Sequence, residues 1–199
     1  MSAQESRPVT VRHRFSHAIA EGDGISVVAA VEDAEAARAA QEQRAEALVV
    51  SGDPAPLRDA TALPILWRGR AELERAAEVA DAVTVRLDAG EALERVHADA
   101  LALGLDCAVE VRSEEELELA LELVDPEIFL LVPPAGDEQG RLELVLDLLA
   151  AVPAGKLAVA DLALTTEDEV HELERAGVDA VIVHADDVSP LVGEAPPEV

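Results

Sequence analysis

Residues 100–132, ALALGLDCAVEVRSEEELELALELVDPEIFLLV, contain one strand–helix–strand unit. Asp106–Val111 and Glu127–Val132 are short, mainly apolar runs, which is typical of parallel strands buried on both faces. Between them, apolar residues recur at the spacing of one helix face: Leu117, Ala120, Leu121 and Val124. This order predicts two parallel strands joined by a right-handed helical crossover.

The same alternation extends along the chain in both directions. Helix starts are indicated by Ser113, which precedes three glutamates, and by Thr166, which precedes Glu169 at the spacing of a capping box. Eight runs are predicted to be strands: Gly24–Val31, Ala47–Ser51, Pro64–Arg68, Ala82–Leu87, Asp106–Val111, Glu127–Val132, Lys156–Ala160 and Asp179–Val183.

Eight strands alternating with helices predict an α/β fold, a compact (β/α)₈ TIM barrel. Only a short segment containing Pro190, Pro196 and Pro197 follows the last strand, so the last outer helix is expected to be stunted or missing. A doubly wound open sheet is the alternative, but it usually has five or six strands and often a Gly-rich first turn, which is absent here.

The domain organisation follows from the same pattern. Residues 1–23 are expected to be irregular with a short helix at Arg12–Ala20, residues 24–190 to form one barrel domain, and residues 191–199 to be a flexible acidic tail. The N-terminal segment or a partner chain is expected to cover the gap left by the last helix.

Charge and composition exclude several classes of protein. The 199 residues carry 42 Asp and Glu against 15 Lys and Arg, a net charge of −27, which argues against nucleic-acid binding. A single cysteine, Cys107, excludes a disulfide framework and a Cys-based metal site. No membrane span or signal peptide is visible, and no cofactor or metal is predicted. The acidic surface with Lys156 as the only lysine favours a halophilic cytoplasmic protein; an ordinary acidic protein is the alternative.

Polar residues at the carboxyl ends of the strands form the candidate site, since barrel enzymes place their chemistry there. Glu110 interrupts an apolar strand and could be a general acid or base, or could form a structural salt bridge with Arg68, Arg86 or Arg112. Arg68 and Arg86 could clamp a carboxylate or phosphate, or neutralise Glu32, Glu110 and Asp161. For Glu110 and for the two arginines, the sequence leaves both the functional and the structural role open. Lys156 lies at the start of its strand, which excludes Schiff-base chemistry.

Several stretches resemble the indole-3-glycerol-phosphate synthase family, within the ribulose-phosphate-binding barrel group. Residues 100–121, ALALGLDCAVEVRSEEELELAL, resemble the family's fifth βα unit, and the similar pieces GISVVAAVED, LPILWRG, LAVADLALTTEDEVHELERAGVDA and AGVDAVIV fall in the family's order. The resemblance spans about residues 24 to 190.

The resemblance implies a decarboxylating ring closure, and it also exposes differences. The family's fifth-strand Glu falls on Glu110, its third-strand Lys on Arg68, and its seventh-strand Glu on Asp161, which the resemblance assigns as catalytic residues. Glu32 replaces a first-strand Lys, and His184 stands where the family has a Gly-rich phosphate grip. With Arg86 and Arg112, these two residues are the predicted substrate-binding set.

The sequence is therefore compatible with two functions. The chain is either a synthase-like carboxy-lyase of tryptophan synthesis, or a catalytically inactive barrel that binds small molecules, regulates or acts as a scaffold. The expected ligand is a small anionic or aromatic metabolite. The expected protein partner is a second copy or another chain, covering an exposed apolar seam between the first and eighth strands.

Overall fold

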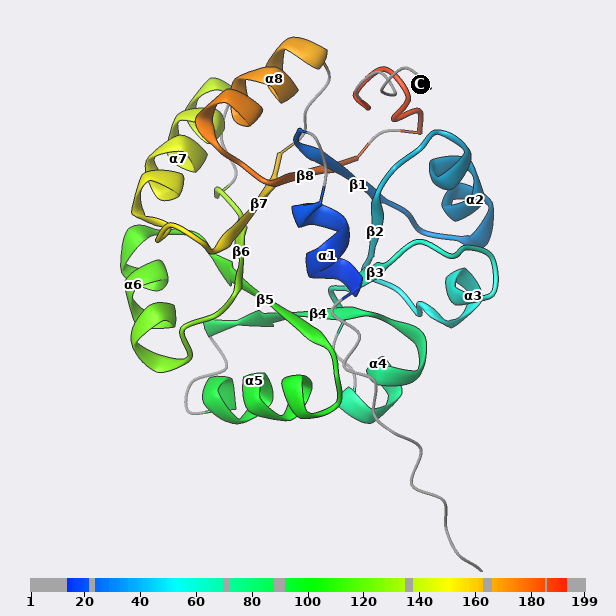
Figure 1. Cartoon of the computed structure of the whole chain (residues 1–199), viewed down its shortest axis with the longest axis horizontal. Coiled ribbons are helices and arrows are strands. Elements are labelled where there is room, and N and C mark those ends of the chain that lie inside the picture. Colours follow the sequence, from blue (N-terminus) through cyan, green and yellow to red (C-terminus); the bar gives the residue numbers. More distant parts are fainter. Residues whose placement is uncertain are drawn as a thin grey trace, which may run out of the picture.

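A closed barrel of eight parallel strands forms the centre of the computed structural model, which describes residues 14–21, 24–69, 72–87, 92–134, 138–162, 166–184 and 186–192. Each strand pairs with the next one along the chain, and β8 pairs with β1 to close the sheet (Figure 1). The strands are β1 (Ser26–Ala30), β2 (Ala47–Val50), β3 (Ile65–Trp67), β4 (Ala82–Arg86), β5 (Asp106–Val111), β6 (Ile128–Leu131), β7 (Leu157–Asp161) and β8 (Ala180–Val183). This confirms the predicted TIM barrel and excludes the open sheet.

Helices alternate with the strands and form the outer ring (Figure 1). They are α2 (Ala34–Glu42), α3 (Ala55–Arg58), α4 (Leu73–Val79), α5 (Ala92–Ala102), α6 (Glu114–Leu123), α7 (Glu138–Ala151) and α8 (Glu167–Ala176), preceded by α1 (Arg14–Ala20). After β8, residues 186–192 form turns and no helix, as expected for the last unit. Among the described helices, none has the length and apolarity needed to cross a membrane.

The two predicted helix caps are present, one of them in a modified form. The Thr166 hydroxyl accepts from Glu169 N, and the Glu169 carboxylate accepts from Thr166 N, which completes a capping box. The Ser113 hydroxyl likewise accepts from Glu116 N. The Glu116 carboxylate, however, accepts from Arg112 N at 2.8 Å and not from Ser113 N. The start of α6 therefore also fixes the backbone just beyond β5.

An aliphatic layer fills the space between the barrel and the outer helices. It contains Trp67 and Cys107, both buried, at the outward positions that strand alternation gives them in β3 and β5. Burial raises the pKa of the Cys107 thiol to about 12, so this thiol is unreactive at neutral pH.

The expected exposed seam between β1 and β8 is not found in the described residues. Val27 and Ala29 of β1 and Val181 of β8 are buried, and so are Val188 and Leu191 of the same outer layer. The backbone N of Val188 also donates to Oε1 of Gln43, the C-cap residue of α2, at 2.8 Å. The described part of the seam is therefore buried within this chain, in a layer that also contains apolar side chains of the segment after β8, and the partner chain stays a prediction.

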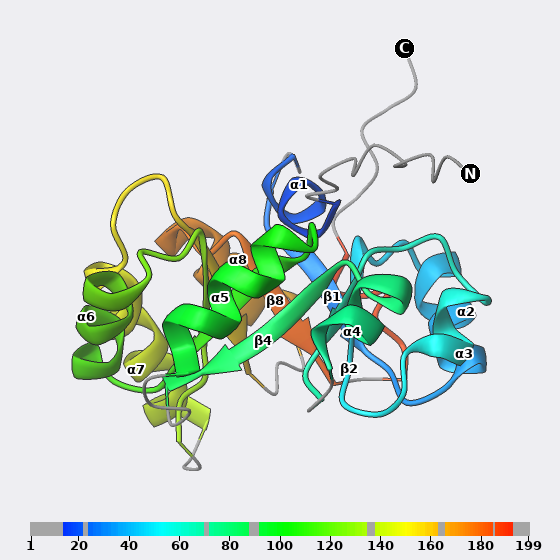
Figure 2. The same cartoon turned by 90° about the horizontal axis from the view of Figure 1, so that it is seen from below.

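The interior of the barrel is filled differently at its two ends. Inward positions at the amino-terminal end hold small side chains, among them Ala47, Ala82 and Ala180. Helix α1 lies across this opening, opposite the strand arrowheads (Figure 2), and its Phe15 and Ile19 belong to the interior cluster. The N-terminal helix therefore closes the barrel floor and does not replace the last outer helix, which corrects the expectation from the sequence.

Asp106, the first residue of β5, holds α1 in this place. Its Oδ2 atom accepts from the backbone N of Phe15 at 3.1 Å and of Ser16 at 2.9 Å. These amides lie in the first turn of the helix, where no intrahelical acceptor exists. A buried carboxylate at the floor of the barrel thus serves as the N-terminal cap of the helix that closes it.

Other carboxylates just before strands bind the preceding strand. Glu46 accepts from Val27 N at 2.8 Å, Asp81 from Ile65 N at 3.0 Å, and Asp179 from Ala158 N at 2.7 Å. Each contact joins the residue before one strand to the start of its neighbour. We infer that these contacts help to set the register of the parallel pairs at the floor of the barrel.

We expect Phe15→Ala to lower the free energy of unfolding by about 3–5 kcal/mol, because the ring is fully buried and its removal leaves a cavity in the barrel floor. Leu101→Ala, at a leucine on α5 that is 43% exposed, is the control and should change it little. Urea unfolding measures both. Equal effects of the two substitutions would contradict the assignment of α1 as the closure of the barrel.

Candidate functional site

Six of the predicted site residues lie at the carboxyl-terminal mouth of the barrel. Strand alternation turns them inward, where the next shell below them is aliphatic. They come from five strand ends: Arg68 after β3, Arg86 in β4, Glu110 and Arg112 at β5, Asp161 in β7 and His184 after β8. The sequence analysis therefore identified side chains that the fold brings together.

A continuous chain of charged contacts joins five of these residues. Glu110 pairs through Oε1 with Arg112 and through Oε2 with Arg68 Nη2 at 3.4 Å. Arg68 Nη1 reaches across the mouth to Asp161 Oδ2 at 2.5 Å. The second oxygen of Asp161, Oδ1, lies 2.7 Å from His184 Nε2. Arg86 Nε stands farther away, at 3.9 Å from Glu110 Oε1.

The two carboxylates of this chain are buried and paired. The side chains of Glu110 and Asp161 are 6% and 10% exposed. Burial alone would raise the pKa of Asp161, but the hydrogen bond with His184 and the charge and hydrogen bond of Arg68 together outweigh it and lower that pKa. Asp161 is therefore ionised at neutral pH and can only accept hydrogen bonds.

Arg68 differs from the two other arginines of the mouth in how it is held. It is 19% exposed and lies between two carboxylates, whereas Arg112 and Arg86 are 40% and 49% exposed. Glu110 therefore forms the salt bridges that the sequence offered as one of its two roles, and it forms them with Arg68, Arg86 and Arg112. The outer faces of Arg86 and Arg112 still reach solvent.

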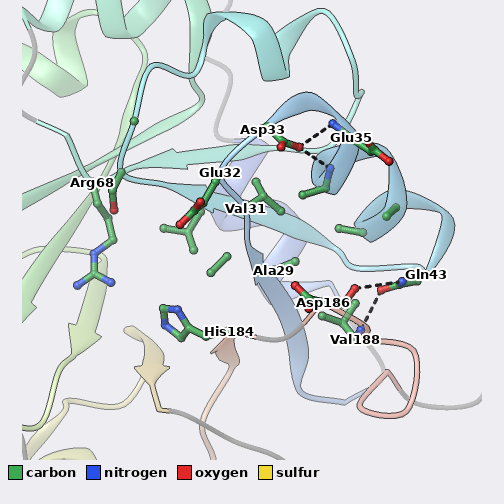
Figure 3. Close-up of a pocket in the computed structure, with 17 residues that line it drawn as sticks. Ala29, Val31, Glu32, Asp33, Glu35, Gln43, Arg68, His184, Asp186 and Val188 are labelled. Atoms are coloured by element: carbon green, nitrogen blue, oxygen red, sulfur yellow. Dashed lines mark hydrogen bonds between the residues drawn. The ribbon is translucent and has the colours of Figure 1, made fainter.

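Glu32 lies in a separate part of the mouth. It is exposed and lines a cavity of about 750 Å³ between the strand ends and α2. Figure 3 shows Arg68 and His184 on one side of this cavity and α2 on the other. Its apolar wall includes Ala30, Val31 and Val49, and its acidic residues are Glu32, Asp33, Glu35 and Asp186.

The first turn of α2 is held by its own cap at the edge of this cavity. Asp33 Oδ1 accepts from Glu35 N and Ala36 N, both at 2.9 Å. These backbone amides are therefore already used, which removes the usual helix-terminus donors for a phosphate group. On this side, the cavity can therefore contact a ligand through side chains and apolar surface.

Sequence reasoning missed two features of the mouth. Arg141 on α7 donates to the carbonyl oxygen of Asp161 at 3.4 Å, and nothing in the helix pattern marks this residue. Gln43, the C-cap residue of α2, binds the backbone of Asp186 and Val188 and so holds the segment after β8 at the cavity. Both contacts join elements that are distant in the chain.

Two further polar residues follow the ends of β3 and β4 in the sequence. Arg70 and Asp88 lie outside the described residues. Within the ranges that are described, no three His, Cys, Asp or Glu side chains gather as metal ligands.

Comparisons with known proteins show the barrel fold, whereas the matches in sequence cover only part of the chain. No family model matches the chain. It is 38% identical over 87 residues to indole-3-glycerol phosphate synthase of Polaromonas naphthalenivorans, covering 43% of this chain and 33% of the relative. It is 28% identical over 135 residues to the same enzyme of a Geobacillus species, covering 64% of this chain and 52% of the relative. The chain thus spans about a third to a half of the length of these curated relatives.

A solved structure shares the fold with higher coverage. The N-acetylmannosamine-6-phosphate 2-epimerase from Clostridium perfringens superimposes with a TM-score of 0.69 at 15% identity, over 83% of this chain and 87% of the epimerase. At that identity the likeness shows the TIM-barrel fold alone. Together the comparisons show the TIM-barrel fold, and the partial sequence matches are to proteins named indole-3-glycerol phosphate synthase.

We expect Asp161→Asn to lower the free energy of unfolding by about 3 kcal/mol, because it leaves Arg68 without one of its two charged partners in a poorly solvated position. Asp53→Asn is the matched control, since Asp53 pairs with Arg75 where both side chains are more than half exposed. A loss no larger than that of the control, in urea unfolding, would contradict the network described here.

The contribution of Asp161 should also depend on pH. Because its pKa is lowered, the unfolded chain binds more protons than the folded chain between the lowered pKa and the ordinary value of 3.8. The stabilisation is fully present above 3.8 and is lost as pH falls through the lowered pKa. The stability difference between the parent and Asp161→Asn should shrink over this acidic range, as measured by unfolding at a series of pH values.

Proposed function

We propose that this chain binds a small anionic metabolite at the carboxyl-terminal mouth of its barrel and does not close an indole ring. The observation that carries the proposal is the gathering of arginines in this place. Four of the fifteen cationic residues, Arg68, Arg86, Arg112 and Arg141, stand at or over the strand ends of a chain with a net charge of −27.

The balance of charge in this cluster favours an anion. Glu110 and Asp161 are the two buried carboxylates that contact the cluster, against four guanidinium groups. Arg112 is 40% exposed and can offer further N–H donors to a carboxylate or phosphate, and the guanidinium of Arg86 adds positive charge beside it. Within the described chain, Arg141 Nε is buried without a partner, and an anionic oxygen would satisfy it. The acidic residues near α2 restrict the anionic group to the arginine side.

The same geometry argues against the synthase reaction. The resemblance places a Lys acid where this chain has Arg68, and a guanidinium remains protonated in proteins, so it cannot donate a proton in catalysis. Arg68 is also bound by two carboxylates. A missing positioned acid typically costs about 10²–10⁴-fold in rate. Glu110, the residue that matches the family, is itself paired with Arg112 and Arg68.

Synthase activity remains the second candidate, because the curated relatives that match the chain are named indole-3-glycerol phosphate synthases. We expect the purified protein to leave the anthranilate-derived carboxyphenylamino-deoxyribulose phosphate unchanged, as followed by indole absorbance in molar KCl. Folding of the same sample is checked by circular dichroism. Turnover that Glu110→Gln abolishes would overturn our proposal and establish ring closure.

Anion binding is tested on the arginines themselves. We expect titration with anthranilate, and separately with inorganic phosphate, to give saturable shifts of the Arg86 and Arg112 Nε–H resonances in NMR spectra. Arg112→Gln should weaken binding about tenfold or more, since a charge-assisted hydrogen bond contributes about 1.5–3 kcal/mol. Arg75→Gln, on the exposed surface of α4, should leave it unchanged. Shifts with neither probe, or equal binding by both variants, would contradict the proposal.

A further inference from the structure

We propose that His184 is a proton-transfer residue of the barrel mouth, held by Asp161 and acting on a small carbonyl compound in the adjoining cavity. The inference rests on the proposed function in one respect, because such a group acts only on a ligand that the mouth admits. It goes beyond that function by giving the mouth an acid–base group, His184, that the resemblance to the synthases does not assign.

The hydrogen bond to Asp161 determines which ring nitrogen is available. Asp161 is a carboxylate and can only accept, so the proton of this 2.7 Å contact is on His184 Nε2. In the neutral imidazole the lone pair then resides on Nδ1. No described residue forms a hydrogen bond with Nδ1. A carboxylate that orients an imidazole in this manner is the arrangement that makes histidine an effective base.

The orientation of this pair is supported from across the barrel. Asp161 is fixed through its second oxygen by Arg68, and Arg68 is bound in turn by Glu110. Asp161 is 10% exposed, whereas His184 is 48% exposed. The carboxylate is therefore held in the packed part of the mouth, and the ring it orients extends towards solvent. The histidine is accessible while its position is constrained.

The cavity beside His184 suits a small organic molecule. Its volume of about 750 Å³ lies within the range of about 300–1,000 Å³ that is usual for ligand pockets. His184 and Arg68 line it together, and Ala30, Val31 and Val49 provide an apolar wall. A ligand with a carbonyl group near the histidine and an apolar part over the alanine and valine surface fits these features (Figure 3).

An activated ester provides a probe that needs no knowledge of the natural ligand. In its hydrolysis, His184 Nδ1 takes a proton from water while the water oxygen attacks the ester carbonyl. The bond from the acyl carbon to the leaving phenolate oxygen then breaks, and the imidazolium returns its proton to solvent. The products are the acid and the phenolate, and no further reactant is required.

The test is the rate of p-nitrophenyl acetate hydrolysis by the full-length protein at neutral pH, with His184→Gln and His171→Gln as a matched pair. His171 also contacts carboxylates, Glu174 at 3.0 Å and Glu167 at 3.5 Å, but it is exposed on α8 and lines none of the described cavities. We expect His184→Gln to lower the protein-dependent rate by about tenfold or more, the modest end of what a positioned base contributes. His171→Gln should leave the rate nearly unchanged.

Two further measurements separate proton transfer from other roles. The parent rate should fall in D₂O, and equal rates in H₂O and D₂O would overturn proton transfer as the role of His184. A downfield imidazole N–H resonance assigned to Nε2 should be present in the parent and lost in Asp161→Asn, which keeps the histidine but removes the carboxylate. If His184→Gln folds and hydrolyses the ester as fast as the parent, the proposal is wrong.

The outcome is independent of the test for anion binding. Anthranilate and phosphate report on Arg86 and Arg112, whereas the neutral ester reports on His184. Anion binding without histidine-dependent hydrolysis would retain the proposed function and reject the present inference. Histidine-dependent hydrolysis without anion binding would support His184 as the base and reject the anionic ligand class.

Discussion

The interior of the barrel has to be filled almost without aromatic side chains, and the rest of the structure follows from this constraint. The chain has two Phe, one Trp and no Tyr, and several inward positions are alanine. Close packing requires other groups to occupy that space. At the floor, Phe15 and Ile19 of α1 enter the interior, and the buried Asp106 carboxylate anchors that helix. Above them lies an aliphatic shell, and over that shell the charged side chains of Arg68, Glu110 and Asp161 fill the mouth.

Filling the mouth with charged groups constrains their positions more than it stabilises the fold. A buried carboxylate is costly unless it is paired, and the gain from pairing often does little more than offset desolvation. Once Glu110 is buried, an arginine must approach it, and Arg68 can reach both Glu110 and Asp161 because it extends across the mouth. Asp161 in turn determines where His184 lies. The same contacts that solve a packing problem thus place an oriented imidazole beside a cavity.

Local sequence patterns predicted the parts of the structure that depend on local periodicity. The eight apolar runs became eight strands, and the polar residues named at their carboxyl ends include Arg68, Arg86, Glu110 and Arg112, which contact one another in the structure. The place of α1, the covering of the seam by Val188 and Leu191, and the approach of Arg141 to Asp161 depend on contacts between distant segments, which periodicity does not encode. One overlooked signal was present, namely the carboxylate that precedes or begins an apolar run at Glu46, Asp81, Asp106 and Asp179. Each of these binds backbone amides at the floor of the barrel.

Neither the partial sequence matches nor the shared fold assigns an activity to this chain, so its function has to be inferred from the residues at the strand ends. The sequence matches parts of indole-3-glycerol phosphate synthases, while the fold also matches a sugar-phosphate epimerase. TIM barrels host many unrelated reactions by changing the residues at these ends. Replacing a lysine by Arg68 exchanges a group that can release a proton for one that stays charged. In the described mouth, His184 is the imidazole that Asp161 orients at the edge of the cavity. The best candidate for acid–base chemistry in this barrel therefore lies just after β8, where the resemblance places the phosphate grip of the synthases and not one of their catalytic residues.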